Sequence, residues 1–215
     1  ERKSTIYCKK CLYPSFSATP MEFDQNGICM GCRSNEFKLN ISGEEYEERK
    51  NKLLDIVNEN KNESNDYDCI VPVSGGKDSY YQTHFVKEVL GLHPLLVTYN
   101  GNNYSDVGWE NLMNMKKVFN CDHIIVNPSE VILKKLNRIS FIVMGDMNWH
   151  NHVGIYTTAP RIAIKFKIPI IFWGEHGYAD LCGQFSIQDF PEMNYRERLE
   201  HICRGFEWNF FENIE

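Results

Sequence analysis

Short apolar runs alternate with amphipathic segments along most of the chain after residue 66. Four of these runs are short enough for strands and predict β-strands at 67–74, 93–100, 122–128 and 169–175. The segments between them carry apolar residues at helical spacing and predict helices at 79–91, 105–120, 129–147 and 154–168. This order of elements predicts an α/β fold, a doubly wound parallel sheet with helices on both faces.

Two smaller segments precede this pattern. Residues 42–61 carry an apolar stripe and begin with Ser42 and Glu45 in capping-box positions, which predicts a helix. We therefore expect three parts: a small N-terminal segment at 1–40, a linking helix at 41–65 and a main domain at 66–215. The sequence stops within an aromatic stretch, so we expect the main domain to continue beyond residue 215.

Composition narrows the class of protein. The 215 residues carry a net charge of −6, and because nucleic-acid-binding surfaces are usually basic, we expect no nucleic-acid partner. No apolar stretch approaches the roughly 18 residues of a membrane span, and the first residues contain no apolar signal core. We therefore expect a cytoplasmic protein with no membrane partner, whose cysteines stay reduced.

Half of the cysteines lie close to the N-terminus. Cys8 and Cys11 form one C-x-x-C pair and Cys29 and Cys32 form a second, with 17 residues between the pairs. This spacing predicts a four-thiolate Zn²⁺ site, which is expected to be structural because no ligand position is left open. The ion would stabilise a segment too short to build a core of its own. Two disulfides or a redox pair are the alternatives.

The sequence VPVSGGKDSYY joins the first predicted strand to the first predicted helix. It contains residue types that bind phosphate, namely Ser74, Gly75, Gly76, Lys77, Asp78 and Ser79. Backbone N–H groups at the start of a helix attract phosphate, and the two glycines let it approach the backbone closely. The lysine adds positive charge, the serines add hydroxyl donors, and the aspartate can hold Mg²⁺ beside the phosphates. The spacing differs from that of a Walker A loop.

This S-G-G-K-D-S sequence resembles the signature of the PP-loop ATP pyrophosphatase superfamily. The resemblance implies a Rossmann-like, adenine nucleotide alpha hydrolase-like fold in which the loop holds the β,γ-pyrophosphate of ATP. It also implies that ATP is cut between its α- and β-phosphates, that a substrate oxygen is adenylated, and that Lys77 and Asp78 are catalytic. Asn100 and Gly101 end the second predicted strand, where members of the superfamily wrap adenine and ribose.

Three longer stretches, at 6–36, 69–91 and 159–180, narrow the resemblance. They are similar to the N-acetyl sugar amidotransferase family, which serves surface-polysaccharide, lipopolysaccharide and nonulosonate biosynthesis. The similarity implies that ATP adenylates the N-acetyl oxygen of a sugar and that ammonia then displaces AMP, which leaves an acetamidino sugar. Since nothing in the chain resembles a glutaminase nucleophile with its base, the implied ammonia source is a glutaminase partner acting through a barrel subunit.

Two charged residues are candidates by their position. Glu175 ends the fourth predicted strand and is expected to be catalytic, either holding Mg²⁺ or orienting ammonia. A surface carboxylate is the alternative interpretation. Arg161, near the start of the fourth predicted helix, is expected to bind a phosphate or carboxylate of the substrate, or else to pair with a nearby acid.

A third candidate group lies in the segment 146–154, which we predict to be a loop. It brings Trp149, His150 and His152 together, a combination that could bind the sugar by stacking and hydrogen bonding. A buried turn without a ligand is the alternative.

Two other functions remain open from the sequence. The first is a PP-loop sulfur transferase acting on tRNA, for which Cys182 is the candidate reactive thiol. The second is a nucleotide-binding module that has lost catalysis, against which the intact S-G-G-K-D-S sequence argues. The identity of the sugar, and whether it is nucleotide-linked or a free nonulosonate, stay open.

Overall fold

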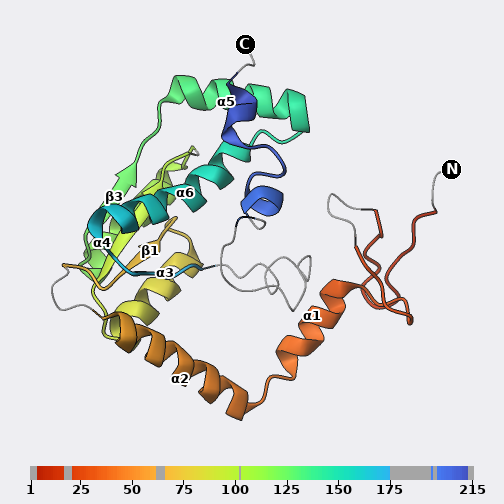
Figure 1. Cartoon of the computed structure of the whole chain (residues 1–215), viewed down its shortest axis with the longest axis horizontal. Coiled ribbons are helices and arrows are strands. Elements are labelled where there is room, and N and C mark those ends of the chain that lie inside the picture. The colour runs from red at the N-terminus through yellow and green to blue at the C-terminus, as the bar shows by residue number, and fades with distance from the viewer. Residues whose placement is uncertain are drawn as a thin grey trace. The chain divides into compact units, whose positions relative to one another are not determined.

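The computed structural model describes residues 4–16, 21–61, 66–101, 103–174, 195 and 198–212 (Figure 1). These residues fall into two compact units. One contains the described residues up to Ile56, and the other contains the described residues of Val57–Gly174 together with the last stretch of the chain.

The larger unit is built on a parallel sheet with the strand order β3-β2-β1-β4. Its strands are β1 (Cys69–Pro72), β2 (Pro94–Tyr99), β3 (His123–Val126) and β4 (Ile170–Ile171). Ile70 of β1 lies opposite Leu95 of β2 on one side and Ile171 of β4 on the other. All three pairings are parallel, so the carboxyl ends of the strands meet at one edge of the sheet.

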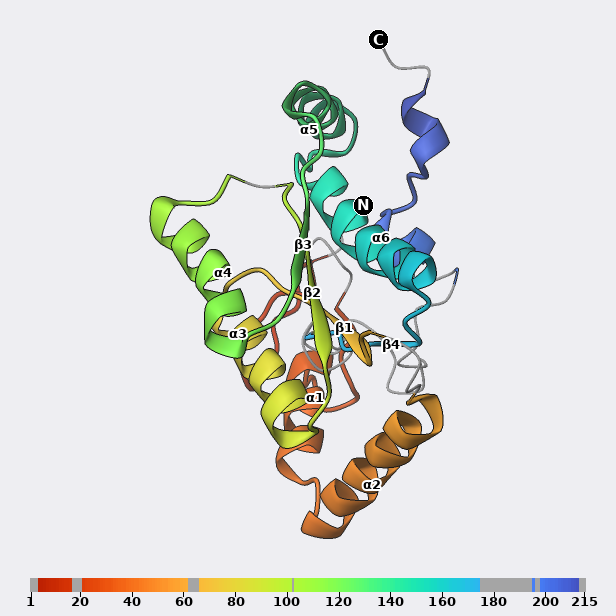
Figure 2. The same ribbon diagram turned by 90° about the vertical axis from the view of Figure 1, so that its left-hand side faces the viewer.

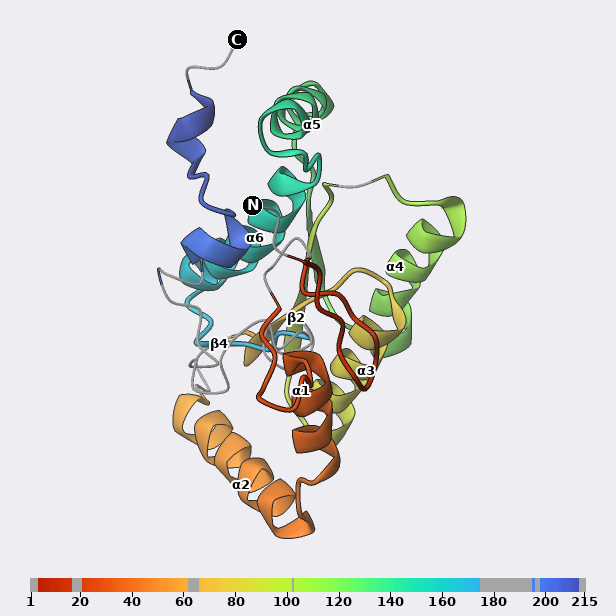
Figure 3. The same ribbon diagram turned by 90° about the vertical axis from the view of Figure 1, so that its right-hand side faces the viewer.

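Helices cover both faces of this sheet. α3 (Lys77–His84) and α4 (Asp106–Phe119) lie on one face, and α6 (Trp149–Phe166) lies on the opposite face (Figures 2 and 3). α5 (Glu130–Met144) packs against α6. A π-helical turn, η1 (Phe85–Val89), continues α3 towards β2. The predicted fold class, an α/β protein with a doubly wound parallel sheet, is confirmed.

The core explains why the strands are mostly apolar. Ile70, Leu95 and Val97 of the two central strands are each at most 2% exposed, and they pack against α6 through Ala159 and Ile162. A strand covered by helices on both faces has no side facing water, so it reads as a continuous apolar run.

The segment 146–154 is not the loop that we predicted, because α6 begins at Trp149 and carries Trp149, His150 and His152 in its first two turns. The Trp149 indole N–H donates to the carbonyl oxygen of Cys203 at 2.9 Å, so distant packing anchors this end of the helix. Gly154, where we expected the helix to start, instead lies inside it against the ring of Tyr99.

The fourth strand is also shorter than predicted. Only Ile170–Ile171 of the apolar run at 169–175 pairs with the sheet as β4. The N–H of Phe172 still donates to the carbonyl oxygen of Ile70 at 2.9 Å. The amide of Gln82 on α3 donates to the carbonyl oxygen of Phe172, so a side chain of α3 takes over from the strand pairing there.

The smaller unit contains irregular chain followed by α1 (Met30–Leu39) and the start of α2 (Gly43–Asn60). The predicted cap of the second helix is present, because the N–H of Glu45 donates to the Ser42 hydroxyl at 3.1 Å. We did not predict α1, which begins directly after Cys29.

The last described residues form two short helical turns, η2 (Arg198–Ile202) and η3 (Trp208–Phe211). Across the described part of the chain, no helix has both the length and the apolar character needed to cross a membrane.

Candidate functional site

The S-G-G-K-D-S sequence connects the carboxyl end of β1 to the start of α3. Gly76 is the N-cap of α3 and has extended backbone dihedral angles, φ −77° and ψ 167°. No described side chain caps this end of the helix, so the first backbone N–H groups of α3 are left without a side-chain acceptor. Free N–H groups and the positive end of the helix dipole make this position suited to an anionic ligand.

Gly75 is fixed in this loop by two constraints. Its φ of +80° lies in the left-handed region that glycine adopts readily. A Cβ at this position would lie 2.8 Å from the backbone nitrogen of Leu112 on α4, closer than real Cβ atoms approach other atoms. The loop is therefore packed directly against the backbone of α4, and only glycine fits there.

The polar side chains of the loop have two different environments. Ser79 is buried, and its hydroxyl accepts the N–H of Ser74 at 2.9 Å, which ties the two ends of the loop together. Lys77 and Asp78 point into solvent with 88% and 77% of their side chains exposed, and their charged groups lie 2.5 Å apart. The lysine and the aspartate are thus accessible to a ligand, whereas Ser79 holds the loop in shape.

The second predicted part of the site lies at the carboxyl end of β2. Asn100 follows that strand, and its side-chain amide donates to Asn127, which follows β3, at 2.7 Å. Gly101 is buried, and a Cβ there would meet the ring of Tyr99 and the side-chain oxygen of Asn151. Both residues predicted to bind the nucleoside therefore lie at the sheet edge where β1 also ends.

A pocket with a volume of about 490 Å³ opens next to Asn100. Besides Asn100 and the helix cap Ser105, the residues that line it are Asn103, Tyr104, Asp106, Trp109 and Glu110. Sequence analysis missed these residues as site candidates, apart from Asn100. A signal was present in the sequence, because Trp109 lies between Asp106 and Glu110 at the start of α4, the helix that follows β2.

The first turn of α6 holds two of the predicted sugar-binding residues in buried positions. Trp149 is 5% exposed and packs against Phe211, with ring centroids 4.3 Å apart. His150 is 4% exposed, and its Nδ1 lies 3.5 Å from the Tyr99 hydroxyl. Burial lowers the pKa of His150, and nearby His152 lowers it further, so the imidazole is neutral near pH 7.

His152 and Arg161 lie further along α6. His152 is half-buried, and its Nε2 lies 3.3 Å from the side-chain amide of Asn148. Arg161 is exposed, so its guanidinium is accessible to a ligand. Glu175, the predicted catalytic carboxylate, lies outside the described residues, as does Cys182.

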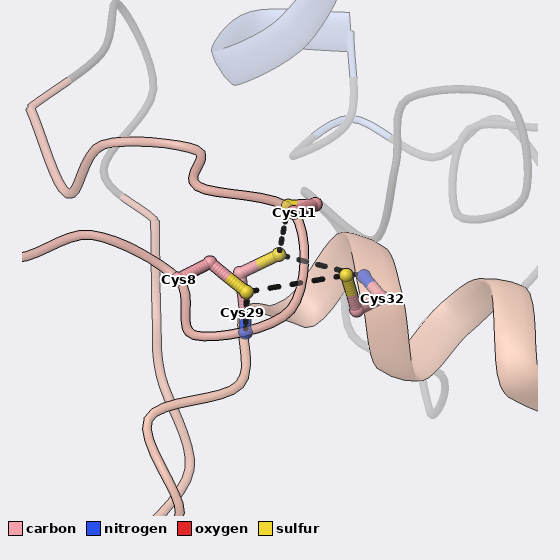
Figure 4. Close-up of side chains that lie close together, drawn as sticks. All are labelled: Cys8, Cys11, Cys29 and Cys32. Carbon is pink, nitrogen blue, oxygen red and sulfur yellow. Dashed lines mark hydrogen bonds between the residues drawn. The ribbon is translucent and has the colours of Figure 1, made fainter.

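The four N-terminal cysteines form a compact cluster. Their sulfur atoms all lie within 4.8 Å of one another and point towards a common centre (Figure 4). The Cys11 and Cys29 sulfurs are 3.6 Å apart, and the Cys8 and Cys32 sulfurs are 4.0 Å apart. Metal–sulfur bonds of about 2.3 Å in a tetrahedron place the sulfurs about 3.8 Å apart, so this group could hold a metal ion. None of the seven described cysteines forms a disulfide.

Backbone amides surround the sulfurs of this cluster. The N–H groups of Lys10 and Cys29 donate to the Cys8 sulfur at 3.4 and 3.3 Å. Although burial opposes it, hydrogen bonds from the backbone N–H groups of Cys11, Cys29 and Lys10 lower the pKa of Cys8 to about 6. Burial, together with hydrogen bonding to Cys11, raises the pKa of Cys32 to about 12. The raised pKa of Cys32 disfavours its thiolate, and a bound cation would favour it.

The described cysteines of the larger unit lie apart from one another in the core and form no cluster. Cys69, Cys121 and Cys203 are all buried, and burial raises the pKa of each thiol, that of Cys69 to about 12. A reactive cysteine needs an accessible thiolate, so these three residues are packing groups.

Comparisons with known proteins found distant similarities. No family model matches the chain. It is 28% identical over 121 residues to the uncharacterized protein MJ1599 of Methanocaldococcus jannaschii, a match that covers 56% of this chain and 42% of that protein. The aligned region thus spans about two-fifths of the relative's length.

Two solved structures resemble the chain at 14% sequence identity. One is an NH3-dependent NAD synthetase from Campylobacter jejuni, with a TM-score of 0.47 and coverage of 76% of this chain and 79% of that one. The other is an NMN synthetase from Francisella tularensis, with a TM-score of 0.41 and coverage of 77% and 73%.

Proposed function

We propose that this protein is an ATP-dependent amidotransferase that converts the N-acetyl group of a sugar into an acetamidino group and releases AMP and pyrophosphate. The observation that carries the proposal is the S-G-G-K-D-S sequence at the junction of β1 and α3, with uncapped N–H groups and Gly75 packed against α4. The three stretches similar to N-acetyl sugar amidotransferases narrow it from an ATP-using PP-loop enzyme to this reaction.

The proposed reaction has two steps. The carbonyl oxygen of the N-acetyl group attacks the α-phosphorus of ATP, and pyrophosphate leaves. Ammonia then adds to the acetyl carbon, and AMP departs with the original carbonyl oxygen, so that a C=O bond becomes a C=N bond. Adenylation is needed because an amide oxygen is a poor leaving group, whereas AMP is a good one.

The residues have the following proposed roles. The N–H groups at the start of α3 and Lys77 bind the β,γ-pyrophosphate and stabilise the charge that develops on it. Asp78 would hold Mg²⁺, which neutralises phosphate charge when it is bound. The backbone of Asn100 and Gly101 would face the nucleoside. Glu175 keeps its predicted role, which is to hold Mg²⁺ or to orient ammonia.

The metal of the cysteine cluster is proposed to be Zn²⁺. Four thiolates without an open position are typical of structural zinc sites, and the sulfur separations fit this geometry. The ion would then stabilise the N-terminal unit and take no part in the reaction.

Nothing among the described residues favours the sulfur-transfer alternative. That chemistry needs a reactive thiolate, and the described cysteines outside the cluster are buried with raised pKa values.

The experiment that tests the proposal follows the acetyl oxygen. The protein is incubated with ATP, Mg²⁺, ¹⁵N-ammonium and a panel of sugars whose N-acetyl groups carry ¹⁸O. Mass spectrometry should find ¹⁸O in AMP and ¹⁵N in the sugar, and Lys77→Ala should abolish both. AMP without ¹⁸O would mean that another acceptor is adenylated, and no AMP from a preparation shown to bind ATP would overturn the proposal.

The ammonia source can be tested with the same assay. We expect ammonium to support the reaction and glutamine alone to fail, because the proposed glutaminase and barrel subunits would be separate proteins. Formation of the amidine from glutamine by the purified chain would contradict this.

A further inference from the structure

The pocket beside α4 has an unusual combination of lining groups for a protein proposed to bind ATP. Tyr104 and Trp109 meet edge to face, with ring centroids 5.8 Å apart. Asp106 and Glu110 add two exposed carboxylates, and Asn100 adds a side-chain amide. Among the described residues no lysine, arginine or histidine lines this pocket.

This chemistry selects against phosphate and in favour of an uncharged ligand with hydroxyl groups. The two carboxylates would repel a phosphate, and none of the described lining residues carries a positive charge that would offset them. Carboxylates and amide oxygens accept hydrogen bonds from hydroxyl groups, and the face of an indole ring covers the apolar side of a ligand. The ligand that fits these groups is a ring with several hydroxyls.

The size of the pocket indicates a ligand larger than ammonium. The pocket has a volume of about 490 Å³, whereas a water-sized molecule takes up about 30 Å³. A monosaccharide ring with an N-acetyl substituent is within this volume, so both the size and the lining groups agree.

The pocket lies next to the phosphate loop. Trp109 lines the pocket, and Leu112, one turn further along α4, is the residue against which Gly75 packs. A second link joins the helices, because the Tyr80 hydroxyl on α3 donates to the carbonyl oxygen of Asn111 at 2.7 Å. A ligand in the pocket would therefore lie within one or two helical turns of the loop proposed to hold the phosphates.

We propose that this pocket is the binding site of the acceptor sugar. The inference rests on the proposed function, since it places the group to be adenylated beside the nucleotide. Trp109 stacks on the sugar ring, and Asp106 and Glu110 accept hydrogen bonds from its hydroxyl groups. The ribose and base of a nucleoside share this chemistry, so the test must separate the two sources.

The test measures binding without turnover. Saturation-transfer NMR and calorimetry are run on the whole chain without ATP, using N-acetylglucosamine, N-acetylgalactosamine and N-acetylmannosamine as probes and adenosine as the competing ligand. Trp109→Ala should weaken binding of the sugar about tenfold or more. Trp208→Ala is the matched control, because Trp208 is 66% exposed and lies outside the pocket. Glu110→Gln keeps the shape of the pocket and should also weaken sugar binding.

Each outcome decides between interpretations. A sugar that binds to the wild type and to Trp208→Ala but loses affinity in Trp109→Ala supports the proposal. The proposal is overturned if adenosine, and not a sugar, is the ligand whose binding requires Trp109. It is also overturned if none of the sugars binds. Amidine formation that is unaffected by Trp109→Ala would overturn this inference but leave the proposed function intact. Sugar binding without amidine or AMP would overturn the function and leave the pocket as a sugar site.

Discussion

Gly75 and Leu112 are in direct backbone contact: a Cβ on Gly75 would lie 2.8 Å from the Leu112 nitrogen and 2.9 Å from its Cα. The contact joins the S-G-G-K-D-S loop to α4, the helix that also lines the pocket. Because the opposing atoms belong to a helix backbone, they cannot move aside as a flexible side chain would. The shape of the loop and the position of α4 are therefore coupled.

This contact predicts the outcome of three glycine substitutions. Gly75→Ala adds both the strain of a positive φ and the clash, and it should lower the free energy of unfolding by more than about 2 kcal/mol. Gly145→Ala adds only the strain, since its φ is +71° and no described atom lies near, and should cost about 1 kcal/mol. Gly76→Ala adds neither and should cost less than about 1 kcal/mol.

Urea unfolding of the three variants is the measurement. The decisive comparison is between Gly75→Ala and Gly145→Ala, because the two positions share the positive φ and differ in the clash. Equal destabilisation of these two variants would show that α4 yields and that the contact is unimportant.

The cysteine cluster predicts that the N-terminal unit depends on a metal. The purified chain should contain about one zinc ion, and Cys29→Ser, which removes a buried ligand, should reduce this to near zero. Cys203→Ser changes an equally buried cysteine outside the cluster and should leave the zinc content unchanged.

Elemental analysis and amide NMR spectra check this prediction. Chelation of the metal should collapse the signals of residues before Ile56, because the hydrophobic cluster described in this unit is built around the proposed metal-binding cysteines. Sharp, unshifted signals after complete removal of the metal would contradict it.

The fold and the position of the S-G-G-K-D-S loop were predictable from the sequence because both depend on local pattern. Buried parallel strands read as apolar runs, and the S-G-G-K-D-S sequence lies between the first strand and the first helix in both the prediction and the structure. The two C-x-x-C pairs likewise predicted the cysteine cluster, since their ligands are set by sequence spacing.

The errors arose where tertiary contacts decide. α6 starts at Trp149 because the carbonyl of Cys203, far along the chain, binds its indole. We read Gly154 as the start of a helix, whereas it lies inside one, where the Tyr99 ring needs the space. The pocket at Trp109 is different, because its lining residues all lie within residues 100–110. The signal was local, but we did not interpret an aromatic residue between two acids at the start of a helix as a binding site.

His123 predicts how stability depends on pH. The Thr98 hydroxyl donates to the carbonyl oxygen of Val73 at 2.6 Å, so at its contact with His123, at 2.9 Å, it accepts the Nε2–H. The Nδ1 of His123 is buried and has no hydrogen-bond partner among the described residues. Burial, with a smaller contribution from Lys116, lowers the pKa of His123 to about 4.

The direction of this pH dependence follows from proton uptake by the unfolded chain. Between pH 6.5 and about 4 the unfolded chain binds a proton on His123 that the folded chain does not, so this contribution to stability is lost as the pH falls through that window. The loss should reach at most about 3 kcal/mol. Unfolding in urea at a series of pH values measures it, and His123→Gln should flatten the dependence. An unchanged slope in that variant would assign the effect to other groups.

Asp78 predicts a separation of activity from stability. The side chain of Asp78 is 77% exposed, and its partner among the described residues is the exposed Lys77, so Asp78→Asn should change the free energy of unfolding by less than about 1 kcal/mol. Loss of the proposed Mg²⁺ ligand should nevertheless lower AMP formation by more than about 100-fold, and it should raise the Mg²⁺ concentration needed for the remaining activity.

Glu130→Gln is the matched control, because Glu130 also lies in the first turn of a helix and forms an exposed ion pair, with Lys134 at 3.6 Å. That variant should keep both stability and AMP formation. Steady-state AMP assays across a Mg²⁺ titration test the prediction, and an Asp78→Asn enzyme with wild-type rate and wild-type Mg²⁺ dependence would remove Asp78 from the proposed mechanism.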